Sequence, residues 1–164
     1  MDRGIGAERG RVRATVRADV QDVARGYGRA EGALPARVRW ARGGYLVLAW
    51  ALVACLAVQV FFAGLAIFVD PARWAWHREF VHAFEFLPLL MLALAFAGRL
   101  PRGMRWLTAA LIGQIAVQYA TAHNGGALAA LHPVNAMVFF WLAVTLGHRA
   151  WRCAQAGSET SLRS

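Results

Sequence analysis

Four long apolar runs follow a polar stretch at the start of the chain, and short polar breaks separate them. The runs cover residues 45–69, 80–97, 104–122 and 133–150. Because an α-helix rises about 1.5 Å per residue, the first run is long enough to cross the roughly 30 Å of hydrocarbon in a bilayer. Short connections make neighbouring helices antiparallel. The pattern therefore predicts an all-α membrane protein, an antiparallel bundle of four transmembrane helices.

The arginine residues predict how this bundle is oriented. All 18 basic residues are arginine. Sixteen lie before the first run, around the turn between the second and third runs, or after the fourth, whereas only Arg73 and Arg78 lie in the first connection. Cationic residues are retained on the cytoplasmic side, so both termini are expected there, with the bundle in the cell (inner or plasma) membrane. Trp74, Trp76 and Tyr119 are expected to mark the outer interface.

Composition supports a membrane location and disfavours nucleic acid as a partner. The chain is 59% hydrophobic and only 16% charged, which leaves too little polar surface for a soluble domain of this size. The net charge of +9 comes from arginines crowded on one side, so the expected partners are the lipid bilayer and a second copy or another membrane protein, rather than nucleic acid. Cys55 and Cys153 are expected at different depths, so no disulfide is predicted. The sequence contains no recognisable catalytic motif.

The two ends of the chain are predicted to lie outside the transmembrane domain, which covers residues 45–151. Residues 1–44 are basic and rich in glycine, and they are predicted to form a disordered cytoplasmic extension. A short amphipathic helix resting on anionic lipid is the alternative, because four valines recur there at helical spacing: Val12, Val16, Val20 and Val23. Residues 152–164 are predicted to form a cytoplasmic tail.

Small residues recur along one face of the third run: Ala109, Gly113, Ala116 and Ala120. Small side chains let two helix backbones approach closely within a membrane. The stripe therefore predicts a helix-to-helix contact, with a structural role.

Four of the five histidines are expected on the outer side of the membrane: His77, His82, His123 and His132. Glu85 lies one helical turn beyond His82, on nearly the same face. Ionisable groups inside a span are costly and usually functional. If the fourth helix begins at Pro133, His132 is interfacial; if it begins near residue 127, His132 lies as deep as His82, and Asn135 shares its face.

This distribution of histidines suggests a b-type haem between the second and fourth spans. His82 and His132 would be the axial ligands, because one imidazole on each face of a macrocycle is a common arrangement. Polar residues on the first and third spans, Gln59 and Gln118, would support the cofactor. Such a protein would serve electron transfer or haem handling.

Several alternatives remain open from the sequence. The histidines could bond to lipid headgroups or water at the interface, and the glutamines could fix helix packing in a cofactor-free membrane subunit or small-molecule carrier. The set His82-x-x-Glu85, with His77, His123 or His132, could bind a metal ion. A di-iron site is disfavoured because Glu85 is the one carboxylate within the spans. The basic extension could also act on lipid.

Two resemblances accompany these observations. The runs QVFFAGLAIFVDPARWAWHREFVHAFEFLPLLMLALAFAGRLP and QYATAHNGGALAALHPVNAMVFFWLA resemble an uncharacterised bacterial family of four-helix membrane proteins, over about residues 45–150. The chain is also distantly similar to one half of a haem A synthase, a four-helix bundle with haem-ligating histidines on its second and fourth helices. That similarity implies ligation by His82 and His132, and Gln59 and Gln118 fit it. This chain has one bundle instead of two, and its loop ARWAWHRE lacks a recognisable counterpart of that family's acidic residue and cysteine pair. The similarity thus implies a haem-binding relative, as a homodimer, rather than haem A synthesis.

Overall fold

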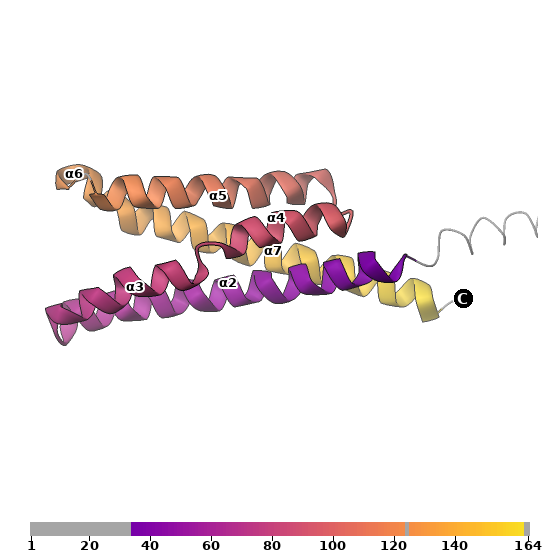
Figure 1. The fold of residues 1–164 in the computed structure, drawn as a ribbon, viewed down its shortest axis with the longest axis horizontal. Helices are drawn as coiled ribbons and strands as arrows, with labels where there is room; N and C mark the ends of the chain where they lie inside the picture. Colours follow the sequence, from indigo (N-terminus) through magenta and orange to yellow (C-terminus); the bar gives the residue numbers. More distant parts are fainter. Residues whose placement is uncertain (1–33, 124, 163–164) are drawn as a thin grey trace, which may run out of the picture. The chain divides into compact units, whose positions relative to one another are not determined.

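The computed structural model describes residues 34–123 and 125–162, with side chains described as far as residue 155. Within that part of the chain every regular element is helical (Figure 1). The elements are α2 (Ala36–Phe68), the 3₁₀ turn η1 (Pro71–Arg73), α3 (Trp74–Phe84), α4 (Leu87–Ala97), α5 (Arg102–His123), α6 (Gly126–Ala129) and α7 (Leu131–Leu162). The prediction of an all-α protein is confirmed for these residues.

Three helical segments are long and apolar enough to cross a membrane: Ala36–Phe68, Pro71–Ala97 and Gly126–Gln155. They indicate a membrane protein. Helix α5 has 22 residues but is not among the three, because arginines at its start and glutamines along its length make it less apolar. A fourth span and the orientation of the bundle therefore stay predictions.

The first and last helices extend beyond the apolar runs. Helix α2 begins directly after Pro35, nine residues before the predicted span, and Val38 and Ala41 in this early part are buried. Residues 36–44 of the predicted extension are thus helical, and α7 continues through most of the predicted tail. The rest of the extension, with its four spaced valines, lies outside the described residues. Residues 35–156 form one compact unit.

The second apolar run is broken into two helices. Helix α3 ends at Phe84, and α4 begins at Leu87 with Pro88 in its first turn. Proline has no N–H to donate, and its ring clashes with the carbonyl four residues earlier, here that of Phe84. A proline inside an apolar run is therefore a common cause of a helix break. The interruption falls at Glu85 and Phe86. Glu85 is the C-cap of α3, and its N–H still bonds to the Val81 carbonyl oxygen at 2.9 Å.

The two halves of the bundle differ in how they are packed. We call the half that contains α4, the start of α2, the start of α5 and the end of α7 the α4 half, and the opposite half, with α3, α6 and the start of α7, the α3 half (Figure 1). Helix α4 packs along both α2 and α5, whereas α3 packs along α2. Most of the continuous apolar core lies in the α4 half: Tyr45, Ala49, Leu52, Met91, Ala95, Leu100, Met104, Leu111, Leu142, Ala143, Leu146 and Ala150.

Close approach of the helices uses glycines other than the one in the predicted stripe. A Cβ atom at Gly147 would lie 3.1 Å from the Trp50 ring, and one at Gly98 would lie 3.2 Å from the Arg42 side chain. In contrast, a Cβ atom at Gly113 would meet nothing within 4 Å, and Gly113 and Ala116 are exposed. Gly113 and Ala116, the two central residues of the predicted stripe, therefore do not form a close helix contact within the described chain.

A buried hydrogen bond joins α2 to α5 inside this core. The Tyr45 hydroxyl lies 2.7 Å from Thr108 Oγ1, and Thr108 Oγ1 donates to the Met104 carbonyl oxygen at 2.8 Å. Because the threonine proton is used on that carbonyl, Tyr45 is the donor to Thr108. Both side chains are fully buried.

Replacing Tyr45 and replacing Thr108 are expected to destabilise the protein to different extents. Tyr45→Phe should lower the free energy of unfolding by about 1 kcal/mol, and Thr108→Val should lower it more, because it leaves the Tyr45 hydroxyl buried without an acceptor. The double variant should be less destabilised than the sum of the two. Thermal unfolding in mild detergent measures the three values, and strict additivity would contradict the assigned bond.

Candidate functional site: polar contacts in the α3 half

His77 clamps α3 to α2 through two reciprocal hydrogen bonds. Its Nδ1–H donates to the backbone carbonyl of Gln59 at 3.0 Å, and Gln59 Nε2 donates to the backbone carbonyl of His77 at 2.7 Å. This arrangement assigns the imidazole proton to Nδ1 and leaves Nε2 as the atom with a free lone pair. Gln59 therefore holds the ring in one orientation.

His132 is held in the same manner on the other side of the bundle. It lies in the first turn of α7, and its Nδ1–H donates to the backbone carbonyl of Gln118 on α5 at 3.2 Å. If the Gln118 side-chain amide turns its oxygen to accept from the Ala136 N–H at 3.2 Å, its nitrogen lies 3.2 Å from both His132 Nδ1 and the His132 carbonyl oxygen. Thr121 Oγ1 lies 3.4 Å from the imidazole Nδ1. The tautomer that donates to the Gln118 backbone carbonyl leaves Nε2 with a free lone pair.

The two imidazoles lie close to each other. Their ring centroids are 6.4 Å apart, and the ring planes are inclined by 67°. We call His77 and His132 the imidazole pair. The sequence had suggested that His82 would partner His132, but no hydrogen bond, ion pair or ring contact joins those two within the described chain. His77 and His82 are five residues apart, which on a helix of 3.6 residues per turn separates them by about 140°, so they serve different faces of α3.

Two buried polar atoms on the elements beside His77 have no hydrogen-bond partner among the described residues. They are Gln59 Oε1 and Arg73 Nε. Arg73 ends the turn η1, one helical turn before His77, and its guanidinium lies 4.5 Å from the Trp76 ring. Buried polar atoms in native proteins nearly always bond to protein, water or ligand. These two therefore point to a missing polar neighbour.

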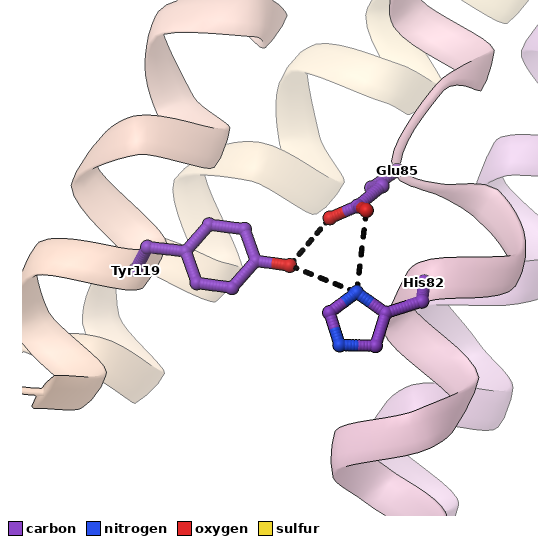
Figure 2. A network of polar contacts seen from close by, with 3 residues as sticks. All are labelled: His82, Glu85 and Tyr119. Carbon is purple, nitrogen blue, oxygen red and sulfur yellow. Dashed lines mark hydrogen bonds and ion pairs between the residues drawn. The ribbon is translucent and has the colours of Figure 1, made fainter.

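His82, Glu85 and Tyr119 form a second cluster, which we call the triad (Figure 2). Tyr119, on α5, donates its hydroxyl proton to Glu85 Oε2. His82 Nδ1 lies 3.2 Å from Glu85 Oε1 and 3.4 Å from the Tyr119 hydroxyl. The His82 side chain is 58% exposed and that of Glu85 is 18% exposed. The Glu85 carboxylate, at the C-cap of α3, thus links this end of α3 to α5.

The other two predicted residues, His123 and Asn135, make hydrogen bonds within α5 and between α5 and α7, respectively. His123 Nδ1–H donates to the carbonyl of Tyr119 in its own helix at 2.8 Å. Asn135 Oδ1 accepts from Gln114 Nε2 at 2.8 Å, which ties α7 to α5. Sequence reasoning treated Tyr119 as an interfacial aromatic residue and did not single out Arg73. The spacing of Tyr119 one turn before His123 was the one available signal.

The described residues contain no group of three or more His, Cys, Asp or Glu side chains that could hold a metal ion. Structural metal sites built from four such ligands are therefore absent from that part of the chain. Two other arrangements of polar side chains remain as candidate sites. One is the imidazole pair, and the other is the triad, which includes the Tyr119 phenol.

Together these features define a helical membrane protein whose apolar core lies mainly in one half of the bundle and whose histidine contacts lie in the other. Residues 59–125 match a family of unknown function, DUF6220. The match supports the resemblance to an uncharacterised family and runs from Gln59 to the end of α5, so it includes the triad and His77 but not His132. No curated protein and no solved structure matches the chain, and nothing in the comparisons supports a similarity to haem A synthases.

Proposed function

We propose that this protein spans the cell membrane four times, with both termini in the cytoplasm, and binds a b-type haem between α3 and α7 through His77 and His132. The haem would serve electron transfer or haem handling. The observation that carries the proposal is the imidazole pair, two rings from different helices that are each anchored through Nδ1. The alternative is a cofactor-free membrane subunit or small-molecule carrier.

Helix α5 is assigned as the third span on grounds of connectivity. It runs from the end of α4 to the start of α6 and α7 (Figure 1). If the segments before and after it both cross the membrane, α5 must return the chain to the other side. Its 22 residues extend about 33 Å at 1.5 Å per residue, which matches the hydrocarbon thickness. The sixteen-to-two distribution of arginines supports the orientation.

The distance between the two rings of the imidazole pair supports the proposal that they bind one metal ion. With metal–nitrogen bonds of about 2 Å, two imidazoles on opposite sides of one metal ion have their centroids roughly 6 Å apart, close to the 6.4 Å between His77 and His132. Histidines that bind metals usually donate their other ring N–H to a carbonyl or carboxylate. Both rings do so here, through the carbonyls of Gln59 and Gln118.

Arg73 is the residue that we propose to bind a haem propionate. Its Nε is buried without a partner and belongs to η1, just before the helix that bears His77. A carboxylate would accept from this N–H and neutralise the guanidinium, and charge-assisted bonds of this kind are the stronger ones. A haem held by two imidazoles supplies one-electron redox chemistry. The protein residues orient the ligands and keep Nδ1 protonated.

The absorption spectrum of the purified protein tests the proposal. Full-length protein from haem-supplied cells, purified in mild detergent, should show a Soret band. His77→Ala and His132→Ala should each remove most of it, because the one remaining imidazole would hold the haem too weakly to retain it through purification. Arg73→Gln should lower haem retention without abolishing it.

The matched controls are the other histidines. His148→Ala, in the α4 half, and His82→Ala should keep the Soret band, because neither ring belongs to the imidazole pair. Loss of the band in His82→Ala with retention in His77→Ala would instead support the pairing suggested by the sequence. A colourless wild-type preparation would refute haem binding.

The interhelical hydrogen bonds are the observation that favours the alternative. Gln114 bonds to Asn135, and Gln59 bonds to the His77 backbone, so these polar side chains already fix helix contacts without a cofactor. Under that alternative, the wild-type protein is colourless and Gln114→Leu or Gln59→Leu lowers the thermal stability. Co-purification of a membrane partner, or uptake of a solute by vesicles, would then identify the role.

A further inference from the structure

We propose that the triad of His82, Glu85 and Tyr119 is a binding site for a divalent transition-metal ion, with Zn²⁺ as the best match. This site is separate from the imidazole pair and does not depend on haem. It uses a nitrogen and two kinds of oxygen donor from two elements, the broken second span and α5 (Figure 2).

Two of the distances between the donor atoms fit one small cation. In a tetrahedral site with bonds of about 2.0–2.2 Å, neighbouring donor atoms are roughly 3.3 Å apart. His82 Nδ1 lies 3.2 Å from Glu85 Oε1 and 3.4 Å from the Tyr119 hydroxyl. The third edge, the hydrogen bond from Tyr119 to Glu85 Oε2, is much shorter, so the phenol must lose its proton and move away from the carboxylate for an ion to enter between them.

The charges also fit. The Glu85 carboxylate supplies one negative charge, and Tyr119 supplies a second if it binds as the phenolate and releases its proton to solvent. These two charges balance a divalent ion, so the occupied site is neutral. Neutrality suits a group within an apolar segment, where an uncompensated charge is costly. His82 binds through Nδ1 with its proton on Nε2.

The environment leaves the site open to an ion. The His82 side chain is 58% exposed. Three protein ligands leave the fourth tetrahedral position for water, as in catalytic zinc sites. Imidazole and oxygen donors suit zinc and other first-row metals.

Calorimetric titration of the full-length, chelator-treated protein with Zn²⁺ in detergent tests this site. The wild-type protein should bind one ion, and His82→Ala, Glu85→Gln and Tyr119→Phe should each weaken binding by at least tenfold. Binding measured in buffers of different ionisation enthalpy should show release of a proton, and Tyr119→Phe should eliminate that release. A purely structural role for Tyr119 would not change the proton count.

Matched controls separate this site from the rest of the protein. His148→Ala and His77→Ala should bind Zn²⁺ like the wild type, and His77→Ala also separates this result from the haem proposal, because it removes most of the Soret band and leaves the metal titration intact. Circular dichroism and gel filtration confirm that each variant is folded, and Tyr119→Phe is nearly isosteric. The proposal is overturned if the wild type does not bind Zn²⁺, or if Tyr119→Phe binds it as tightly and with the same proton release.

Discussion

Replacing Gly147 with leucine is expected to lower the free energy of unfolding by about 3 kcal/mol, at the upper end of the usual cost of overpacking. A Cβ atom at this position already lies 3.1 Å from Trp50 Cε2 and 3.4 Å from two further ring atoms. The indole is rigid, and its edge-to-face contact with His148, at a centroid distance of 5.4 Å, leaves it little freedom to withdraw. A larger side chain must therefore displace either the indole, which is 39% exposed, or α7 itself.

Gly113→Leu is the matched control for this substitution. Gly113 is also a mid-helix glycine, but a Cβ atom there meets nothing within 4 Å, so the change should be neutral or stabilising through helix propensity. Thermal unfolding in mild detergent, followed by tryptophan fluorescence, compares the two variants. The combination Trp50→Ala with Gly147→Leu should recover part of the loss. Equal effects of Gly147→Leu and Gly113→Leu would contradict the close packing of α2 and α7.

Truncation of Leu52 to alanine should destabilise the protein by about 2 kcal/mol, at the lower end of the range for buried leucines. Leu52 is fully buried in the core of the α4 half. Within a bilayer, lipid tails are as apolar as leucine, so transfer from water contributes little to helix association. The loss comes instead from the cavity and from the missing dispersion contacts of its neighbours.

Val60→Ala is the corresponding control on the outer surface of the same helix. Val60 is 64% exposed, so its truncation leaves no cavity and should change the stability by less than about 0.5 kcal/mol. Denaturant unfolding in mixed micelles measures both variants. If Val60→Ala were as destabilising as Leu52→Ala, the exposed face of α2 would have to be covered by another protein surface.

The proposed binding residues lie in the half of the bundle with the smaller apolar core. In the α3 half, the buried side chains among the described residues are few, chiefly Ala66, Phe84 and Thr121. Regions with few buried apolar contacts have low local stability, and ligand-binding segments often come from such regions. Ligands that bind the folded state add stability by mass action. A ligand bound at either proposed site should therefore raise the local stability of the α3 half more than that of the α4 half.

Much of the fold could be predicted from the sequence because its signals are local. Apolar runs of sufficient length predicted helices that can span a bilayer, and Pro88 indicated where the second run is disturbed. The ends of the helices were less predictable, since α2 begins at Ala36 within a polar, arginine-rich segment. Packing of Val38 and Ala41 stabilises that first part, and composition alone did not show it.

The sequence could predict where the histidines gather, but not which side chains contact one another. The clustering of histidines on one side follows from their positions in the chain. Glu85 stands out in the sequence because it is a carboxylate within an apolar run. Which ring meets which depends on how each helix is rotated about its axis. His77 and His82 lie on different faces of α3, and only the packing of α3 against α2 sets which of them turns towards His132.

The amino-acid sequence by itself determined that the chain is helical, that it is apolar enough for a membrane, and that its histidines gather at one end of the predicted bundle, because chain order and hydropathy encode these properties directly. Tertiary structure alone decided that His77 pairs with His132, that Tyr119 completes the cluster of His82 and Glu85, and that Gly147 rather than Gly113 permits close helix contact. These choices depend on helix rotation and separation, which arise from side-chain packing between segments distant in the sequence.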